Sequence, residues 1–236
     1  MCTVTYLPTE TGCLISSNRD EIITRSVALA PDIYPHGSRN LLFPKDPVGG
    51  GTWIVTAPEA TICLFNGAFE PHVRKESYRM SRGMVPIQYF DYLSASLFAN
   101  TFDFVGIEPF SLVVYQSGRL HLLVWDETSV HLTELDPNIP QIWASSTLYS
   151  PEVRMHRKEM FNAWLESDPS FDQESIMRFH QSEKTDAENG LLIHRSNGLK
   201  TVSVTSVERH DAYDTSMVYR DLIGDVTSSK NLSFIL

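Results

Sequence analysis

Cysteine and positive charge are both scarce in this sequence. Its 236 residues include three cysteines, an odd number without paired spacing, so neither a disulfide framework nor a zinc site is indicated. The 19 lysines and arginines are outnumbered by 29 acidic residues, which gives a net charge of −10. This sign opposes binding to a phosphate backbone, so we predict no nucleic-acid partner.

Long apolar runs and metal-ligand patterns are missing as well. No apolar run approaches the roughly 20 residues of a membrane-spanning helix, and residues 1–7 lack the basic and apolar regions of a signal peptide. The 8 histidines form no HxxxH or HExxH pair, so we predict no metal and no cofactor. We therefore expect a cytoplasmic protein without a membrane span. The sequence does not determine its oligomeric state.

Strand and helix signals alternate along what we predict to be one domain, residues 1–236. A hairpin is predicted at 3–7 and 13–17, followed by a proline- and glycine-marked excursion at 31–51. Further strands are predicted at 52–56, 60–65, 110–115, 120–125, 130–135, 191–194, 201–207 and 217–222. Helices are predicted at 86–100, 150–166 and 171–179. This order indicates an α+β layered domain.

Cys2 offers the most distinctive chemistry in the chain. If Met1 is removed, one residue carries both a thiol and a free α-amine, whose reference pKa values are about 8.5 and about 7.7 to 8.0. The amine can then act as the base that activates its own thiol, which is how an N-terminal nucleophile works. No separate catalytic histidine is needed.

The predicted hairpin brings polar residues to Cys2. With the turn centred near Glu10, paired residue numbers sum to about 20, which puts Asn18 opposite Cys2. Asp20 then lies diagonally on the same face, and Arg19 lies just past the pairing. The carboxylate would hold the ammonium group and the guanidinium would favour the thiolate. The same residues also fit a strand that ends in a polar turn, with Cys2 as a small buried hydrophobe.

Several blocks in a fixed order resemble the signature of the NRDE family, of the transport and Golgi organisation type. They are Met1-Cys2-Thr3, Asn18-Arg19-Asp20-Glu21, Gly50-Gly51-Thr52-Trp53, Phe65-Asn66-Gly67 and Ser81-Arg82-Gly83. That family is similar to the N-terminal-nucleophile (Ntn) hydrolases. The resemblance therefore implies a four-layer αββα sandwich of two antiparallel sheets.

The resemblance also implies roles for four residues. In the related choloylglycine and penicillin acylase group, an N-terminal cysteine attacks an amide carbonyl, an arginine and an aspartate orient it, and asparagines bind the oxyanion. Cys2, Arg19 and Asp20 match the first three roles, and Asn66 matches the first asparagine. An ordinary Asn-Gly turn explains Asn66 equally well.

Three further features do not add to the expected catalytic set. The second oxyanion asparagine has no counterpart, because Ser145-Ser146-Thr147 occupies the corresponding region. Arg154 and Arg157 fit the solvated charged face of an amphipathic helix, so they are left out of the catalytic set. Gly49-Gly50-Gly51 precedes a strand, which indicates a tight turn or a close backbone approach and not a phosphate loop.

These observations predict an N-terminal-cysteine hydrolase that acts on a non-peptide amide bond of a small-molecule amide or acyl substrate. The alternative is a non-catalytic binding or trafficking protein for an apolar carrier such as an acyl thioester or haem, since the family is associated with lipid and haem handling. A third possibility is that Cys2 is a redox-sensitive thiol in a structural protein.

Overall fold

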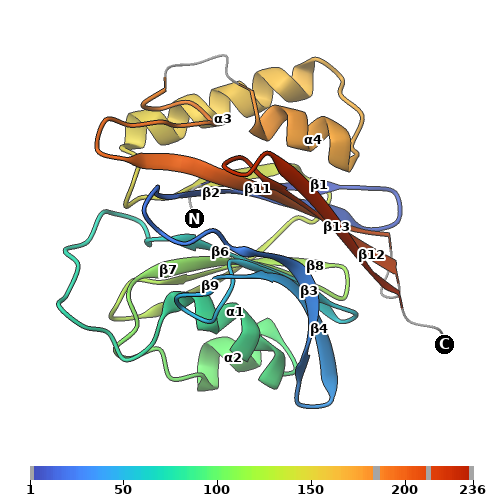
Figure 1. Cartoon of the computed structure of the whole chain (residues 1–236). Helices are drawn as coiled ribbons and strands as arrows, with labels where there is room; N and C mark the ends of the chain where they lie inside the picture. The colour runs from blue at the N-terminus through green and yellow to red at the C-terminus, as the bar shows by residue number, and fades with distance from the viewer. Residues whose placement is uncertain (1–2, 183–186, 211–213, 234–236) are drawn as a thin grey trace.

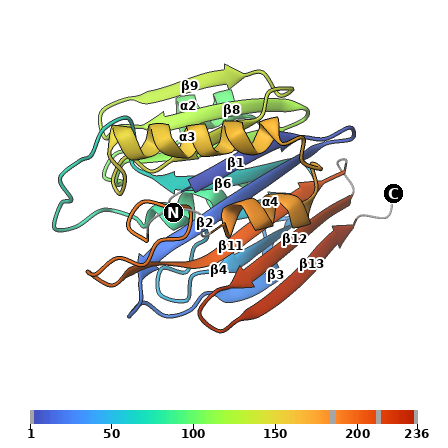
Figure 2. The same cartoon turned by 90° about the horizontal axis from the view of Figure 1, so that it is seen from above.

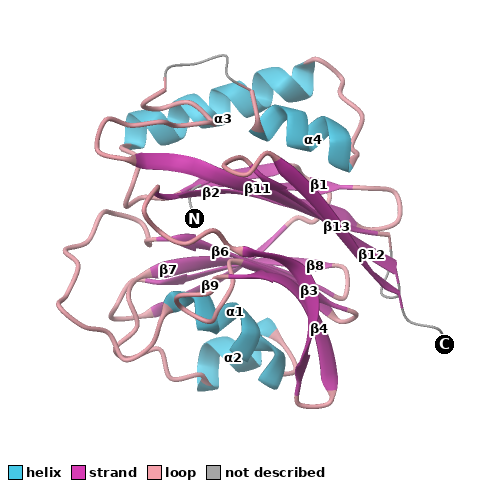
Figure 3. Cartoon of the chain, in the orientation of Figure 1, coloured by secondary structure: helices cyan, strands magenta, loops and turns pink. Residues whose placement is uncertain are grey.

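Two stacked antiparallel sheets with helices on their outer faces make up the structure (Figure 1). This computed structural model describes residues 3–182, 187–210 and 214–233. Figure 3 separates the helices of the outer layers from the strands of the inner ones. The predicted α+β class with two antiparallel sheets is confirmed.

The first sheet contains both the N-terminal hairpin and the last strands of the described chain. Its strands in spatial order are β10 (Gln141–Ala144), β1 (Thr3–Pro8), β2 (Cys13–Ile22), β11 (Leu199–Arg209), β12 (Asp214–Asp221) and β13 (Val226–Ser233). Each neighbouring pair is antiparallel. The hairpin therefore lies in the middle of the sheet, between strands from the C-terminal half.

The second sheet follows the order of the sequence. Its strands are β3 (Leu29–His36), β4 (Arg39–Lys45), β5 (Ile54–Ala57), β6 (Ala60–Asn66), β7 (Phe110–Gln116), β8 (Arg119–Trp125) and β9 (Val130–Leu135). The last three form the predicted meander, which is confirmed.

Helices cover the outside of each sheet. The second sheet is covered by η1 (Arg82–Met84), α1 (Val85–Gln88), η2 (Tyr89–Asp91) and α2 (Ala95–Thr101). The first sheet is covered by α3 (Pro151–Glu166) and α4 (Gln173–His180), which lie over it when viewed from above (Figure 2). Ser150 caps α3 and Asp172 caps α4 through side-chain oxygens, within one residue of the predicted starts of these two helices.

Alternation along the hairpin feeds two separate cores. Ile15 and Tyr6 belong to the large cluster between and around the sheets. Leu7 and Leu14, which pair across the hairpin, instead join Phe161 and three residues of α4 and its surroundings, Ile176, Phe179 and Leu191. The period-2 pattern therefore fixes which face of the first sheet meets the second sheet and which meets α3 and α4.

Two predicted segments differ from the structure. The excursion at 31–51 contains the β3–β4 hairpin, which turns at Gly37 with a φ of +57°. Its prolines concealed the strand, but β3 is an edge strand, where a missing N–H is tolerated. The predicted helix at 86–100 is broken at Tyr92, which is extended, and Ser94 caps a new helix by accepting a hydrogen bond from the N–H of Leu97.

Beyond residue 140 the strand prediction was correct for 201–207, which lies within β11, and wrong in part elsewhere. Residues 191–194 form only an isolated bridge between His194 and Lys200. The strand expected at 217–222 is β12, but β13 follows it, and β10 was not expected at all. Both β10 and β13 are edge strands of the first sheet, where half of the backbone lacks a ladder partner and the sequence pattern is correspondingly weak.

Candidate functional site

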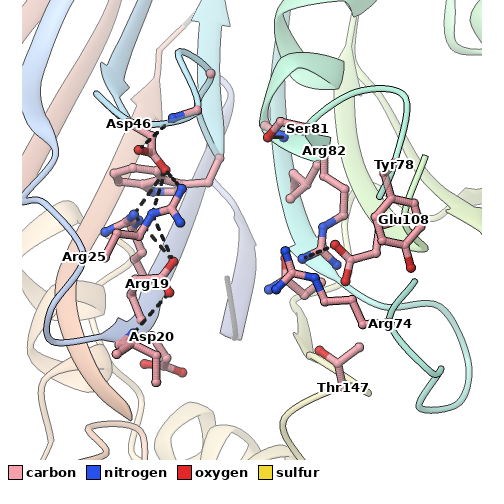
Figure 4. Close-up of a pocket in the computed structure, with 18 of the residues that line it drawn as sticks. Arg19, Asp20, Arg25, Asp46, Arg74, Tyr78, Ser81, Arg82, Glu108 and Thr147 are labelled. Atoms are coloured by element: carbon pink, nitrogen blue, oxygen red, sulfur yellow. Dashed lines mark hydrogen bonds and ion pairs between the residues drawn. The ribbon is translucent and has the colours of Figure 1, made fainter. Parts of the chain in front are cut away.

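A cavity of about 660 Å³ lies near the end of β2 and brings together three of the four predicted site residues, Arg19, Asp20 and Asn66. Cys2, the predicted nucleophile, lies outside the described residues. Figure 4 shows the two walls of the cavity: Arg19, Asp20, Arg25 and Asp46 on one, and Ser81, Arg82, Glu108, Arg74 and Thr147 on the other.

The register of the hairpin differs by one residue from the prediction. Thr3, and not Cys2, is paired with Asn18, so paired numbers sum to 21. The reason is the turn, in which the N–H of Thr9 donates to the carbonyl of Gly12, so that its centre lies between Glu10 and Thr11.

Asn18 and Asp20 share one face of β2 and Arg19 lies on the other, as the alternation of side chains along a strand requires. Asn18 and Asp20 point toward α3 and α4, where the Asn18 amide donates to the carbonyls of His180 (3.1 Å) and Leu191 (2.7 Å). Arg19 points the other way, toward the second sheet, and its guanidinium lies 5.0 Å from the ring centre of Trp53. Arg19 and Asp20 therefore reach the cavity from opposite faces of β2.

Arg19 belongs to a cluster of charges on one wall. Its guanidinium is 3.4 Å from Asp46 and 3.7 Å from Glu21, while Arg25 lies closer to Asp46, at 2.6 Å. Burial alone would raise the pKa of Asp46, but hydrogen bonds from Arg25 and from the N–H groups of Val48 and Gly49 outweigh it and lower that pKa. Asp46 is thus the anion around which this wall is arranged.

Asp20 is held from the side of the helices and β11. It is 3 % exposed, and one carboxylate oxygen accepts a hydrogen bond from the Thr201 hydroxyl at 2.6 Å. The other oxygen accepts a short hydrogen bond from the phenol of Tyr149. Two hydroxyl donors thus fix the orientation of the carboxylate at the edge of the cavity.

Asn66 ends β6 and lines the cavity. Its backbone carbonyl accepts a hydrogen bond from the Ser145 hydroxyl at 2.8 Å, and its side-chain amide has no hydrogen-bond partner in the described ranges. Gly67 has a φ of +85°, and a Cβ there would lie 2.4 Å from the hydroxyl oxygen of Ser146. Asn66 is thus the last residue of a paired strand, followed by a glycine with positive φ, and its place at the cavity is not that of a residue in an ordinary Asn-Gly hairpin turn.

The opposite wall is tied to the first by backbone contact. A Cβ on Gly51 would lie 2.3 Å from the carbonyl oxygen of Gly83, and the N–H of Thr52 donates to that carbonyl at 2.8 Å. This is the close backbone approach predicted for the glycine run. On the same wall, the two carboxylate oxygens of Glu108 lie 3.2 Å from the guanidinium of Arg82 and 3.2 Å from the imidazole of His72.

The sequence profile of the family described as Transport and Golgi organisation 2 matches residues 1–220. The chain belongs to the Transport and Golgi organisation 2 family. No curated protein matches it.

In this family member, the prediction for Arg157 was wrong. Arg157 is fully buried, because it lies one turn from Val153 and one turn from Phe161 on the inward stripe of α3. Its guanidinium donates short hydrogen bonds to the Thr3 hydroxyl and the Gly190 carbonyl. The signal was the position of an arginine in line with apolar residues. Arg154 is half-buried and donates to the Phe69 carbonyl at 3.2 Å.

His180 was also missed by the sequence analysis. It is fully buried at the end of α4, and burial, together with the charge of Arg157, lowers its pKa to about 3. Because the Asn18 amide nitrogen donates elsewhere, its oxygen accepts from Nδ1 of His180. Nε2 is then the acceptor for the Thr5 hydroxyl at 2.7 Å. The imidazole is neutral, with one defined tautomer.

The two described cysteines are unreactive by position. Cys13 and Cys63 are fully buried, and burial raises the pKa of both thiols, that of Cys63 to about 12. In a thiol-labelling experiment on the folded protein they serve as internal controls for Cys2.

No three His, Cys, Asp or Glu side chains within the described ranges gather as metal ligands do. Likewise, no helix in those ranges is long and apolar enough to cross a membrane.

Proposed function

We propose that this family member is an N-terminal-nucleophile hydrolase of the NRDE type, with one αββα domain over residues 1–236, that cleaves a non-peptide amide. The observation that supports this most is the meeting of Arg19, Asp20 and Asn66 at one cavity, from two sheets. Cys2 directly precedes Thr3 in the sequence. Thr3 pairs with Asn18, and Asp20 lies two residues further along the same strand, so the start of β1 is close to Asp20.

In the proposed reaction, removal of Met1 frees the α-amine of Cys2, which takes the thiol proton. The sulfur bonds to the amide carbonyl carbon, the C–N bond breaks, and the amine leaves with that proton. Water then cleaves the thioester and restores the thiol. Asp20 orients the amine, Arg19 favours the thiolate, and the side-chain amide of Asn66 donates to the oxyanion. A reducing cytoplasm is part of the proposal, because Cys2 must remain a thiol.

The decisive experiment compares the wild type with Cys2→Ala on a panel of small amides and acyl thioesters. We expect turnover to be lost in the variant while the melting temperature stays nearly the same, because the change removes one sulfur at the chain end. Intact mass spectrometry checks that Met1 is absent from the active protein. Equal turnover by both proteins would refute the hydrolase.

The second candidate is a protein that binds an acyl thioester or haem without hydrolysing it. The absence of a second oxyanion asparagine favours this candidate. Ser145 and Thr147 occupy the corresponding region, and their hydroxyls hydrogen-bond to each other at 2.8 Å. The charged walls of the cavity, with Arg25, Asp46 and Glu108, suit a polar ligand better than an apolar one. Saturable binding of an acyl thioester or haem, with retained Met1 and no turnover, would select this candidate.

A further inference from the structure

Among the described residues, a buried arginine next to the proposed site has no carboxylate directly paired with it. Arg157 is fully buried, and within the described ranges it makes no ion pair. Its donors go to the hydroxyl of Thr3 and to the backbone carbonyls of Asn189 (3.2 Å) and Gly190. A buried charge of this kind is costly unless nearby groups compensate it. The question is therefore which group near Arg157 supplies negative charge.

Tyr149 connects Arg157 to the negative charge of Asp20. The guanidinium carbon of Arg157 lies 3.6 Å from the centre of the Tyr149 ring, and that of Arg195 lies 5.2 Å from it. The phenol hydroxyl donates to Asp20, whose negative charge opposes that of the arginines, and Arg195 also lies 4.0 Å from the carboxylate of Glu188. Cations over the face of an aromatic ring interact favourably with it. They also withdraw electron density, which makes the O–H a stronger donor to the carboxylate.

The same guanidinium also reaches the start of β1. Its hydrogen bond to the Thr3 hydroxyl attaches α3 to the residue that directly follows Cys2. Through Tyr149 it is connected to Asp20. One side chain from a distant part of the sequence thus relates the end of the chain that bears the thiol to the carboxylate proposed to orient its amine.

We propose that Arg157 and Tyr149 are positioning residues for the Cys2 nucleophile. This inference depends on the function proposed above and adds to it the residues that set the distance between the N-terminus and Asp20. Neither side chain lines the cavity, so neither is available to bind substrate. Their effect is on the reacting geometry, and a loss of either should lower kcat and leave KM unchanged.

Tyr149→Phe is the sharpest test, because it removes one hydroxyl and keeps the ring that stacks on Arg157. The first readout is the rate at which iodoacetamide labels Cys2, followed by mass spectrometry, with buried Cys13 and Cys63 as internal controls. The second is hydrolysis of p-nitrophenyl acetate, an activated acyl probe. We expect labelling and kcat to fall about 10- to 100-fold, with KM within about twofold.

Tyr89→Phe is the matched control. Tyr89 is also buried and also donates its hydroxyl to one acceptor, Gln116, at 2.6 Å, but it lies with the helices outside the second sheet. Its loss should lower the melting temperature about as much as Tyr149→Phe and leave labelling and kcat as in the wild type. Arg157→Lys keeps the charge but cannot serve three acceptors with a planar fork, so we expect it to reproduce the effect of Tyr149→Phe.

The outcomes separate this inference from the proposed function. If Cys2→Ala abolishes p-nitrophenyl acetate hydrolysis while Tyr149→Phe matches the wild type, the positioning role is wrong and the hydrolase stands. Equal losses in Tyr149→Phe and Tyr89→Phe would overturn it too, because they would reflect stability alone. If Cys2→Ala hydrolyses the probe like the wild type, the proposed function fails first.

Discussion

The two spaces on either side of the first sheet are filled by different chemistry. Toward the second sheet, β1 and β2 bury apolar residues such as Val4 and Ile15. Toward α3 and α4 they bury the apolar pair Leu7 and Leu14 and, beyond it, a polar network in which Asn18 and Asp20 lie among hydrogen-bonded groups that include His180. Apolar packing tolerates similar shapes, whereas a buried polar network is satisfied in one geometry only. The helix side of the sheet is thus the side that specifies position.

The largest test of this contrast is Arg157→Ala. We expect it to lower the free energy of unfolding by about 3 to 5 kcal/mol, because it leaves three buried acceptors without their donor and removes the cation that lies over the Tyr149 ring. Ile15→Ala, on the opposite face, should cost about 2 to 4 kcal/mol through a cavity. Urea unfolding measures both. Only Arg157→Ala should also slow the labelling of Cys2, and equal slowing would erase the contrast.

The second test uses pH. The pKa of His180 is about 3 in the folded chain and about 6.5 in the unfolded one, so between these values the unfolded chain takes up a proton that the folded chain excludes. Stability should therefore fall as the pH falls through this window, by about 1.4 kcal/mol per pH unit from this group. His180→Gln, compared by urea unfolding at pH 7 and pH 5, should show a shallower fall. An identical slope in both proteins would contradict the neutral buried imidazole.

The smallest effect is expected at the charged wall of the cavity. Asp46→Asn should change stability at pH 7 by about 1 kcal/mol or less, because its partner Arg25 is one-third exposed and solvent screens the pair. Since the pKa of Asp46 is lowered in the fold, its contribution is present above about pH 4 and is lost below it. Thermal unfolding at pH 7 and pH 3 measures this. A cost of several kcal/mol would mean that the polar contacts of this wall stabilise the fold as much as those on the helix side of the first sheet.

Local pattern predicted the elements better than it predicted their relations. Alternation located the hairpin, and a serine followed by a proline located the start of α3. The register was missed because a shift of half a residue in the turn centre moves every partner by one. Edge strands β3, β10 and β13 were concealed by prolines or polar composition, which edge positions tolerate.

The candidate site was predicted in part for similar reasons. Arg19, Asp20 and Asn66 were found through the chemistry expected around Cys2, and they line one cavity. Arg157 and His180 were not found, because their roles depend on partners more than 150 residues away in the chain, Thr3 and Asn18. Single-sequence patterns report on neighbours within a few turns and carry no signal for such pairs.

The glycine contact between the two cavity walls has a consequence for how the site can diversify. Main chain meets main chain where Gly51 faces Gly83, so the width of the opening there is set by backbone and not by any side chain. Substitution of the charged side chains around the entrance would therefore leave this width unchanged. A methyl group at Gly51 would collide with the carbonyl of Gly83, force the two backbone segments apart and so widen the opening for any ligand.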